Sequence, residues 1–359
     1  MPGMDASSSP HPADSIMETE IDEQPGALAR TLKANAAEID ALCRDIRGRN
    51  ITTVMIAARG SSDNAGVYAK YLFQAYNGFP VAMATPSLFT FYHTPPRLAG
   101  VFVLGISQSG QSEDIVEVLT EARRQGALTA AITWDANSPL AAQSQRVLRL
   151  ETGPEKAVAS TKTFTSSLAL IAALSTAWEG SRERAESLVR LPDLAEKTLE
   201  STRAPAAARA PSYRSASRCI VIGRGFCYAI AMEIALKLKE LTYVTAEPYS
   251  AADFQHGPMA IVEEGFPVVL LAPAGALQVH MLEFARGIRE KKPDLIVISD
   301  LPELLQMGNT ALPLPVGVPE WLSPILAVLP GQLFALRLSQ AKGIDPDAPR
   351  GLRKVTVTR

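Results

Sequence analysis

The sequence has few cysteines, and this scarcity excludes two classes of small protein. Only three occur in 359 residues, namely Cys43, Cys219 and Cys227, and no two of them form a CxxC pair. An odd number of widely spaced cysteines indicates neither a disulfide framework nor a structural zinc site. We expect small buried side chains in a reducing compartment, which is the cytoplasm.

An excess of charge of one sign is also lacking. The chain carries 35 Lys and Arg against 37 Asp and Glu, for a net charge of -2. Nucleic-acid binding depends on positive charge that neutralises phosphates, so we expect no nucleic-acid partner. His11, His93 and His280 have no partners at metal-ligand spacing, and we predict no metal site.

Long apolar runs are missing as well. No stretch approaches the roughly 20 apolar residues that a membrane-spanning helix needs, so we expect no membrane partner. The first 16 residues are polar and rich in Pro and Ser, without the apolar core of a secretory signal. We interpret residues 1–20 as a disordered tail.

Short apolar runs that alternate with helical patterns make up most of the remaining sequence. Residues 51–58, 101–106 and 128–133 are continuous apolar runs, and the first two lead through a polar turn into a helical pattern. Such alternation is typical of βαβ units, in which helices cover both faces of a parallel sheet. The sequence therefore predicts an α/β fold with a doubly wound, flavodoxin-like parallel sheet.

The second half of the chain repeats this design. Residues 219–222 form an apolar run, 223–225 a Gly-Arg-Gly turn and 227–241 a helical pattern, as residues 54–71 do earlier. Ala, Pro and Ser cluster near residues 205–215 and indicate a boundary. We predict two tandem domains with a C-terminal tail, over residues 21–208, 209–342 and 343–359.

A serine-rich turn, Ser107-Gln108-Ser109-Gly110-Gln111-Ser112, comes where a predicted strand ends and a helix begins. Backbone N–H groups and the helix dipole favour an anion there, so the turn predicts a phosphate site. An ordinary polar loop with a serine N-cap is the alternative. Residues 59–62 and 158–162 offer further hydroxyls, and no nucleotide-binding motif is present.

Candidate acid–base residues follow in the second half. Lys237 and Glu240 are three residues apart on one face of the predicted helix, as either a general base with a neighbouring cation or a solvated ion pair. His256 lies in a loop, where it could move a proton at a sugar ring oxygen or be merely exposed.

Together these segments resemble the sugar isomerase (SIS) family, and specifically the isomerase half of glucosamine-6-phosphate synthase and its stand-alone relatives. The resemblance covers nearly the whole chain from Met17. It includes ETEIDEQP (18–25), ARGSS (58–62), ISQSGQSEDI (106–115), EKAVASTKTFTSSL (155–168), GRGFCYAIAMEIALKLKELTYVTAEPYSAADFQHGP (223–258) and DPDAPRGLRKVTVT (345–358).

The resemblance implies roles for individual residues. Residues of the first group hold the sugar phosphate, and they are Ser107, Gln108, Ser109 and Ser112. A second group lines the rest of the substrate pocket, and it consists of Ser61, Ser62, Val158 and Ser160. Glu240 matches the carboxylate that moves a proton between C1 and C2, with Lys237 beside it. His256 matches a ring-opening histidine supplied by the neighbouring subunit of a homodimer, and Lys354 a tail lysine able to form a Schiff base.

Two departures from the family pattern affect the expected reaction. About 20 residues precede the isomerase-like region and Pro2 follows Met1, where the synthase has a glutaminase domain starting with a cysteine. Ser61 and Ser112 stand where the family has threonine, which keeps the hydroxyl. We expect a glucosamine-6-phosphate deaminase that needs no cofactor and forms fructose 6-phosphate and ammonia. Alternatives are a galactosamine-6-phosphate deaminase, a sugar–amino acid deglycase, an aldose–ketose isomerase or a non-catalytic phosphosugar sensor.

Overall fold

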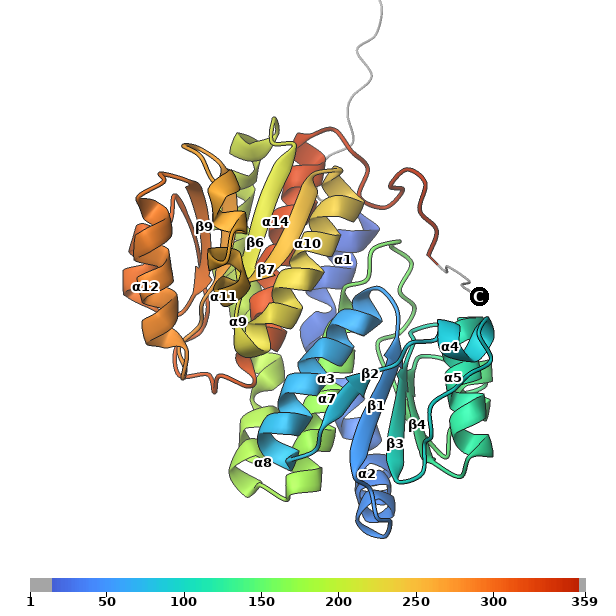
Figure 1. The fold of residues 1–359 in the computed structure, drawn as a ribbon. Helices are drawn as coiled ribbons and strands as arrows, with labels where there is room; N and C mark the ends of the chain where they lie inside the picture. The colour runs from blue at the N-terminus through green and yellow to red at the C-terminus, as the bar shows by residue number, and fades with distance from the viewer. Residues whose placement is uncertain (1–14, 355–359) are drawn as a thin grey trace, which may run out of the picture.

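A computed structural model describes residues 15–354, which form two halves built on one plan (Figure 1). Each half contains a five-stranded sheet, and every strand pair in both sheets is parallel. The first sheet has the order β2-β1-β3-β4-β5 and the second the order β10-β9-β8-β6-β7. Numbered within its own half, each order is 2-1-3-4-5, the flavodoxin-like doubly wound order. The predicted α/β fold and its internal repeat are confirmed.

The strands are short, as expected for parallel strands between helices. In the first half they are β1 (Thr53–Ala58), β2 (Val81–Met83), β3 (Val101–Ile106), β4 (Leu128–Thr133) and β5 (Arg146–Arg149). In the second half they are β6 (Arg218–Gly223), β7 (Thr245–Ser250), β8 (Pro267–Leu271), β9 (Asp294–Ser299) and β10 (Thr310–Pro313). All residues of β3 and β4 are buried, because helices cover both faces of the sheet at these central strands.

Helices of the first half lie on both faces of its sheet. They are α1 (Ile16–Asp22), α2 (Gln24–Arg47), α3 (Ser61–Asn77), α4 (Ser87–Thr90), α5 (Glu113–Arg124), α6 (Pro139–Ala142), α7 (Lys162–Glu179), α8 (Arg182–Val189) and α9 (Leu191–Arg209). The second half contributes η2 (Ala210–Tyr213), η3 (Gly225–Cys227), α10 (Tyr228–Thr242), α11 (Ala251–Gln255), η4 (Pro258–Ile261), α12 (Gln278–Arg289), α13 (Pro302–Met307) and α14 (Ser323–Ala341).

The antiparallel packing of α3 against α10 joins the two halves. Ser61 at the start of α3 contacts the later turns of α10, whereas Tyr76 near the end of α3 stacks on Phe226 just before α10, with ring centroids 6.2 Å apart. The end of α10 therefore lies at the carboxyl edge of the first sheet. Residues of the second half thereby reach the edge where the serine-rich turn begins.

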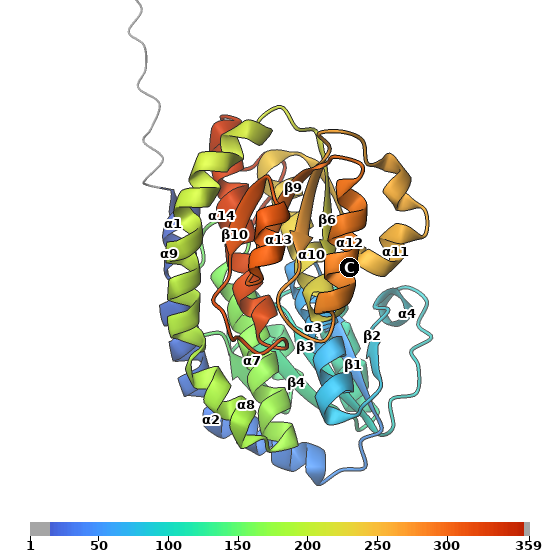
Figure 2. The same ribbon diagram turned by 90° about the vertical axis from the view of Figure 1, so that its left-hand side faces the viewer.

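The structure corrects the expected extent of the N-terminal tail. Residues 16–20 belong to α1 and not to a disordered tail, because the backbone N–H groups of Ile16 and Met17 donate to Asp347 at 2.7 and 2.8 Å. Helix α9 ends at Arg209, next to the predicted boundary at 208/209, and packs on α14 of the second half (Figure 2). Residues 1–14 of the predicted disordered tail and residues 355–359 of the predicted C-terminal tail lie outside the described residues.

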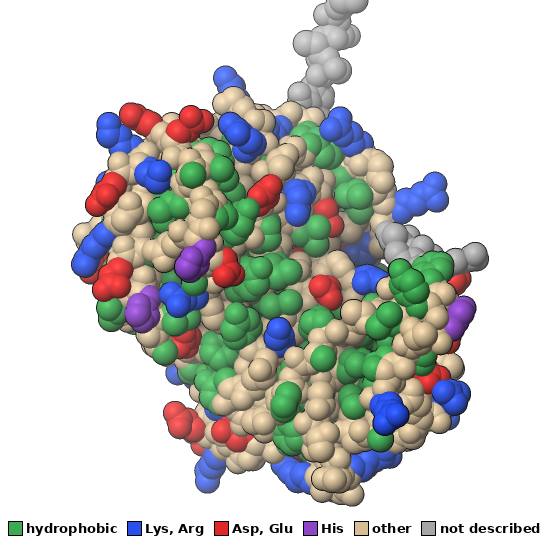
Figure 3. Space-filling model, viewed as in Figure 1, with side chains coloured by type: hydrophobic (Ala, Val, Ile, Leu, Met, Phe, Trp, Pro, Cys, Tyr) green, Lys and Arg blue, Asp and Glu red, His purple; other side chains and the backbone are tan. Residues whose placement is uncertain are grey.

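The surface and the helices agree with the balanced composition. Positive and negative side chains are interspersed over the face shown in Figure 3. No helix within residues 15–354 is long and apolar enough to cross a membrane. Cys43, Cys219 and Cys227 are free and buried, which confirms the expected burial.

Candidate active site

The serine-rich turn forms a compact cradle between β3 and α5. The Ser107 hydroxyl accepts the backbone N–H of Gly110 at 3.1 Å, and the Ser109 hydroxyl accepts that of Gln111 at 3.3 Å. Gly110 has a φ of +64°, and a Cβ at this position would lie 2.2 Å from the Ser138 hydroxyl. Only glycine therefore fits both the backbone conformation and the space of this turn.

Ser112 is the N-cap residue of α5, but its side chain makes no capping hydrogen bond. The alternative interpretation of the turn as a side-chain N-cap therefore does not describe this serine. Arg59 ties the cradle to the end of β1, because its Nε lies 2.8 Å from the Asp114 carboxylate in the first turn of α5. The ends of β1 and β3 thus form one polar edge, at a place where parallel sheets bind anions.

A buried ionic cluster on α10 faces this edge. Lys237 and Glu233 are fully buried, and the Lys237 ammonium lies 3.4 Å from Glu233 and 2.5 Å from Glu240. The Glu233 carboxylate also accepts hydrogen bonds from the Ser61 hydroxyl at 2.9 Å and the Asn64 amide at 2.7 Å. Because Lys237 is buried, the alternative of a solvated Lys237–Glu240 pair is wrong.

The charges of this cluster control its protonation. Burial lowers the pKa of Lys237, but the two neighbouring carboxylates outweigh burial and raise that pKa to about 12. Burial raises the pKa of Glu233, and the Lys237 ammonium opposes this. Lys237 therefore stays protonated at neutral pH, where an ammonium can stabilise negative charge that develops on a substrate. Glu240, with 23% of its side chain exposed, is the carboxylate of this cluster that a substrate can reach.

Sequence reasoning missed Glu233. A signal was present, because Glu233, Lys237 and Glu240 follow one another at spacings of four and three residues on one helix face. Its partners Ser61 and Asn64, however, lie more than 160 residues earlier in the chain. The tertiary contact that buries this carboxylate is not visible in a local pattern.

The loop between β5 and α7 and the C-terminal segment form the third part of the site. Glu155 is fully buried and accepts Lys354 at 2.6 Å and the Thr163 hydroxyl at 2.7 Å. Burial raises the pKa of Glu155, but the Lys354 ammonium and these hydrogen bonds outweigh it and lower the pKa below its ordinary value. Val158 and Ser160 are half-buried in the same loop.

Tyr243 holds the C-terminal segment in place further upstream. Its hydroxyl accepts the backbone N–H of Arg350 at 2.7 Å, and the Arg350 guanidinium lies 4.1 Å from the centre of its ring. Tyr243 adopts a left-handed φ of +55°, which costs a non-glycine residue on the order of 1 kcal/mol. Gly78 ends α3 at the corresponding place of the first half, with a φ of +73°.

The predicted site residues thus fall into groups at the carboxyl edge of the first sheet, with one exception. The α10 cluster meets Ser61, Ser62 lies in the first turn of α3, and Lys354 meets the loop that carries Val158 and Ser160. His256 is the exception: it is exposed at the end of α11, and its imidazole has no hydrogen-bond partner among residues 15–354.

At the corresponding edge of the second half, carboxylates of the chain itself accept the backbone N–H groups. Residues 272–277, between β8 and α12, read Ala-Pro-Ala-Gly-Ala-Leu and contain no hydroxyl. The backbone N–H of Ala276 donates to Glu320 at 2.8 Å, and that of Ala274 donates to Asp300 at 2.7 Å. The donors that could hold a phosphate are therefore already paired with carboxylates in this half.

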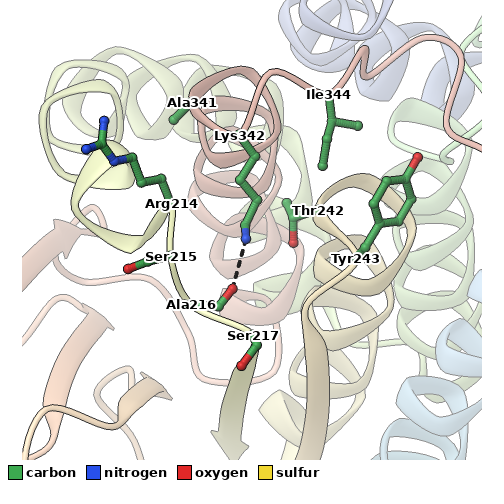
Figure 4. Close-up of a pocket in the computed structure, with 9 residues that line it drawn as sticks. All are labelled: Arg214, Ser215, Ala216, Ser217, Thr242, Tyr243, Ala341, Lys342 and Ile344. Carbon is green, nitrogen blue, oxygen red and sulfur yellow. Dashed lines mark hydrogen bonds between the residues drawn. The ribbon is translucent and has the colours of Figure 1, made fainter.

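A cavity of about 510 Å³ lies at the amino edge of the second sheet and contains none of the predicted site residues (Figure 4). Its Lys342 ammonium donates to the Ala216 carbonyl at 2.8 Å. It is lined by Arg214, Ser215, Ala216, Ser217, Thr242, Tyr243, Ala341, Lys342 and Ile344. The candidate site is instead an open polar edge of the first sheet.

Comparison with known proteins decides the family. The SIS domain matches the chain twice, over residues 49–177 and 212–339, one segment in each half. The chain belongs to the SIS domain family. This confirms the family resemblance, and both SIS segments fall within the predicted domains 21–208 and 209–342.

Among curated SIS relatives, the glutamine–fructose-6-phosphate aminotransferase [isomerizing] of Aquifex aeolicus is 35% identical over 349 residues. The match covers 96% of this chain but 57% of the relative, so the chain spans little more than half the length of that relative. The corresponding enzyme of Thermus thermophilus is also 35% identical, with 94% of this chain and 58% of the relative covered.

Solved SIS structures agree with the fold. A protein of Silicibacter pomeroyi DSS-3, provisionally described as a phosphosugar isomerase, is 34% identical, with a TM-score of 0.80 over 93% of this chain and 100% of its own. The C-terminal domain of glucosamine-fructose-6-phosphate aminotransferase from Francisella tularensis is 27% identical, with a TM-score of 0.84 over 95% and 100% of the two chains.

Proposed function

We propose that this SIS chain acts on a phosphosugar and converts glucosamine 6-phosphate and water to fructose 6-phosphate and ammonia. The observation that carries the proposal is the buried Glu233–Lys237–Glu240 cluster, which reaches the carboxyl edge where the serine cradle lies. A phosphate anchor beside an acid–base cluster is what a reaction on a sugar phosphate requires. The relatives named as fructose-6-phosphate aminotransferases support the same substrate class.

Binding begins with the phosphate group in the cradle. Ser107, Gln108, Ser109 and Ser112 offer hydroxyl, amide and backbone donors around the glycine turn. Fixing the phosphate at this end places the other end of an open-chain sugar toward α10 and the loop that carries Val158 and Ser160. Positioning of this kind lowers the entropic part of the barrier.

Proton transfer is assigned to Glu240. This carboxylate takes the proton from C2 of the open-chain amino sugar and returns it to C1, while the aldehyde oxygen takes up a proton released by the C2 amine and becomes the C1 hydroxyl. The Lys237 ammonium stabilises the negative charge that develops on that oxygen, and Glu233 holds Lys237 protonated. The product is an imine at C2, which water hydrolyses to the ketone with release of ammonia.

Ring opening is assigned to His256 of a second copy of the chain. In one chain this imidazole is exposed and has no hydrogen-bond partner among the described residues, so an adjoining molecule can contact it. We propose a homodimer in which each chain donates His256 to the cradle of the other. Lys354 pairs with Glu155, and we assign to this lysine the formation of a Schiff base with the ketone of the sugar phosphate.

Deamination is the proposed direction because it needs only water as the second substrate, whereas amination needs a source of ammonia. Glutamine hydrolysis by a cysteine needs a thiolate, and burial raises the pKa of Cys43 to about 11 and that of Cys219 and Cys227 to about 12. None of the three cysteines is therefore an activated nucleophile.

The test measures fructose 6-phosphate and ammonia from purified protein with glucosamine 6-phosphate. Galactosamine 6-phosphate, a sugar–amino acid conjugate and glucose 6-phosphate are assayed in parallel. We expect equal amounts of both products from glucosamine 6-phosphate alone. Turnover of one of the other substrates instead would replace the deaminase by another phosphosugar enzyme. Binding of fructose 6-phosphate with no turnover of any substrate would replace it by a sensor.

A further inference from the structure

The segment Glu-Thr-Glu-Ile-Asp-Glu-Gln-Pro at residues 18–25 has no role in the chemistry above. It precedes the first matched SIS segment, which begins at residue 49. Yet its acidic side chains are all paired, and those of Glu18 and Glu20 are buried. Two of these pairs lead to the loop over residues 155–161, which we name the substrate loop because it carries Val158 and Ser160.

The carboxylate of Glu20 accepts hydrogen bonds from the backbone of the substrate loop. It is 3% exposed, and its two carboxylate oxygens accept the consecutive N–H groups of Lys156 at 2.5 Å and Ala157 at 3.3 Å. A buried carboxylate is stabilised only where donors satisfy it, so this geometry ties the backbone at 156–157 to α1. Residues 156 and 157 themselves belong to no helix or strand.

Glu23 binds the residue that follows the other end of the substrate loop. Its carboxylate pairs with the ammonium of Lys162, which is 2% exposed and is the first residue of α7. Both ends of the loop are therefore fastened to the same acidic segment. Movement of either end of the loop would break one of these contacts.

Three functional contacts depend on the fastened loop. Val158 and Ser160 are the proposed substrate-lining residues, and the Ser160 hydroxyl lies 2.7 Å from that of Thr163. Glu155, next to the residue that Glu20 binds, receives Lys354 of the C-terminal segment. Displacement of the backbone at 156–157 would move the substrate contacts and the lysine acceptor together.

We infer that Glu20 is a positioning residue: it fixes the substrate loop so that Val158 and Ser160 face the phosphosugar and Glu155 meets Lys354. The contact of Val158 and Ser160 with a phosphosugar rests on the proposed function. The attachment of the loop backbone to Glu20 is independent of the proposed function.

The matched control is Glu18, which lies in the same helix and is also largely buried. Glu18 pairs with Arg203 at 2.8 Å and with Arg337, which lie on α9 and α14 and not in the substrate loop. Glu18→Gln and Glu20→Gln therefore remove the same charge from α1, and each breaks a buried contact. Only Glu20→Gln places an amide N–H₂ group against backbone N–H donors of the loop.

The experiment combines hydrogen exchange without ligand and steady-state kinetics with glucosamine 6-phosphate. In Glu20→Gln we expect faster exchange at the amides of residues 156–161 and a fall of about 10- to 100-fold in kcat/KM, since misplacement of about 1 Å can cost 100-fold. In Glu18→Gln we expect a lower Tm with loop exchange and KM unchanged. Glu23→Gln, at a half-exposed carboxylate, should act as Glu20→Gln does but more weakly.

Each outcome decides a separate question. Unchanged loop exchange in Glu20→Gln, or equal loop exchange in Glu18→Gln, would overturn the fastening role. Faster exchange with unchanged KM and kcat would overturn positioning. If Glu20→Gln does not fold, Glu23→Gln is judged by the same two measurements. Wild-type protein that turns over no phosphosugar would contradict the proposed function. The exchange data would still show whether Glu20 holds the substrate loop in place.

Discussion

The ammonium of Lys354 lies 2.6 Å from a carboxylate oxygen of Glu155 that is completely buried. The pair joins the C-terminal segment to a loop of the first half, 199 residues earlier in the chain. A buried carboxylate without a cation is strongly destabilising, so the segment contributes to stability as well as to the site.

Replacing this lysine should make stability depend differently on pH. Lys354 lowers the pKa of Glu155, so this pair stabilises the wild-type fold above the ordinary carboxyl pKa of 4.5 and is lost as pH falls through the lowered value. In Lys354→Met, burial remains and raises that pKa, and an unpaired carboxylate destabilises the fold at pH 7. We expect the Tm deficit of Lys354→Met to be largest near pH 7 and to shrink toward pH 4.

Lys342→Met is the control for this measurement, because Lys342 donates to the Ala216 carbonyl and not to a carboxylate. Its Tm deficit should be the same at each pH. A Tm deficit of Lys354→Met that stays constant between pH 7 and pH 4 would contradict the ion pair as the cause.

Neutralising Glu240 should separate binding from turnover. Glu240→Gln removes the proposed base but keeps the cradle, so we expect fructose 6-phosphate to bind as before while kcat falls by about 10²- to 10⁴-fold. Glu247→Gln, at an exposed position on β7, is the control and should keep full activity. Isothermal titration and product assays measure the two effects. Unchanged kcat in Glu240→Gln would remove this residue from the proton-transfer step.

The central strands could be predicted from the sequence, and the four edge strands could not. Residues 101–106 and 128–133 are buried throughout and read as continuous apolar runs, and they match β3 and β4 at both ends. The missed strands β2, β5, β7 and β10 are the outer strands of the two sheets. Their residues are partly exposed and include Arg146 and Pro248, because an outer strand is covered less completely.

Site residues that lie close together in the sequence could likewise be predicted, whereas those defined by distant partners could not. The serine cradle lies within one turn, so spacing alone places its donors together. Glu233 and Glu20 were missed because the partners that define them are far away, at Ser61 and in the substrate loop. The expected proximity of His256 to the site also depends on a second chain, which one sequence does not show.

The glycine of the cradle should tolerate no side chain. Gly110→Ala adds a Cβ at a φ of +64° and only 2.2 Å from the Ser138 hydroxyl, so the turn must move. Gly126→Ala is the control, because Gly126 has a φ of +79° but nothing within 4 Å of an added Cβ. We expect about 1 kcal/mol of destabilisation for the control from backbone strain alone.

For Gly110→Ala we expect a larger loss of stability together with loss of fructose 6-phosphate binding. Urea unfolding and isothermal titration measure both effects. Equal losses of stability in the two variants, with binding retained in Gly110→Ala, would contradict the tight packing of the turn against Ser138.

One phosphosugar should bind per chain, although the fold contains two similar sheets. In the second half Glu320 and Asp300 already accept the N–H groups of Ala276 and Ala274, and no hydroxyl replaces Ser109. Titration with fructose 6-phosphate should give a stoichiometry of one. Ser109→Ala should weaken that single site, raise KM more than it lowers kcat, and reveal no second site. A stoichiometry of two, or one site of unchanged affinity in Ser109→Ala, would contradict this prediction. It would show that residues 272–277 of the second half also bind the phosphosugar.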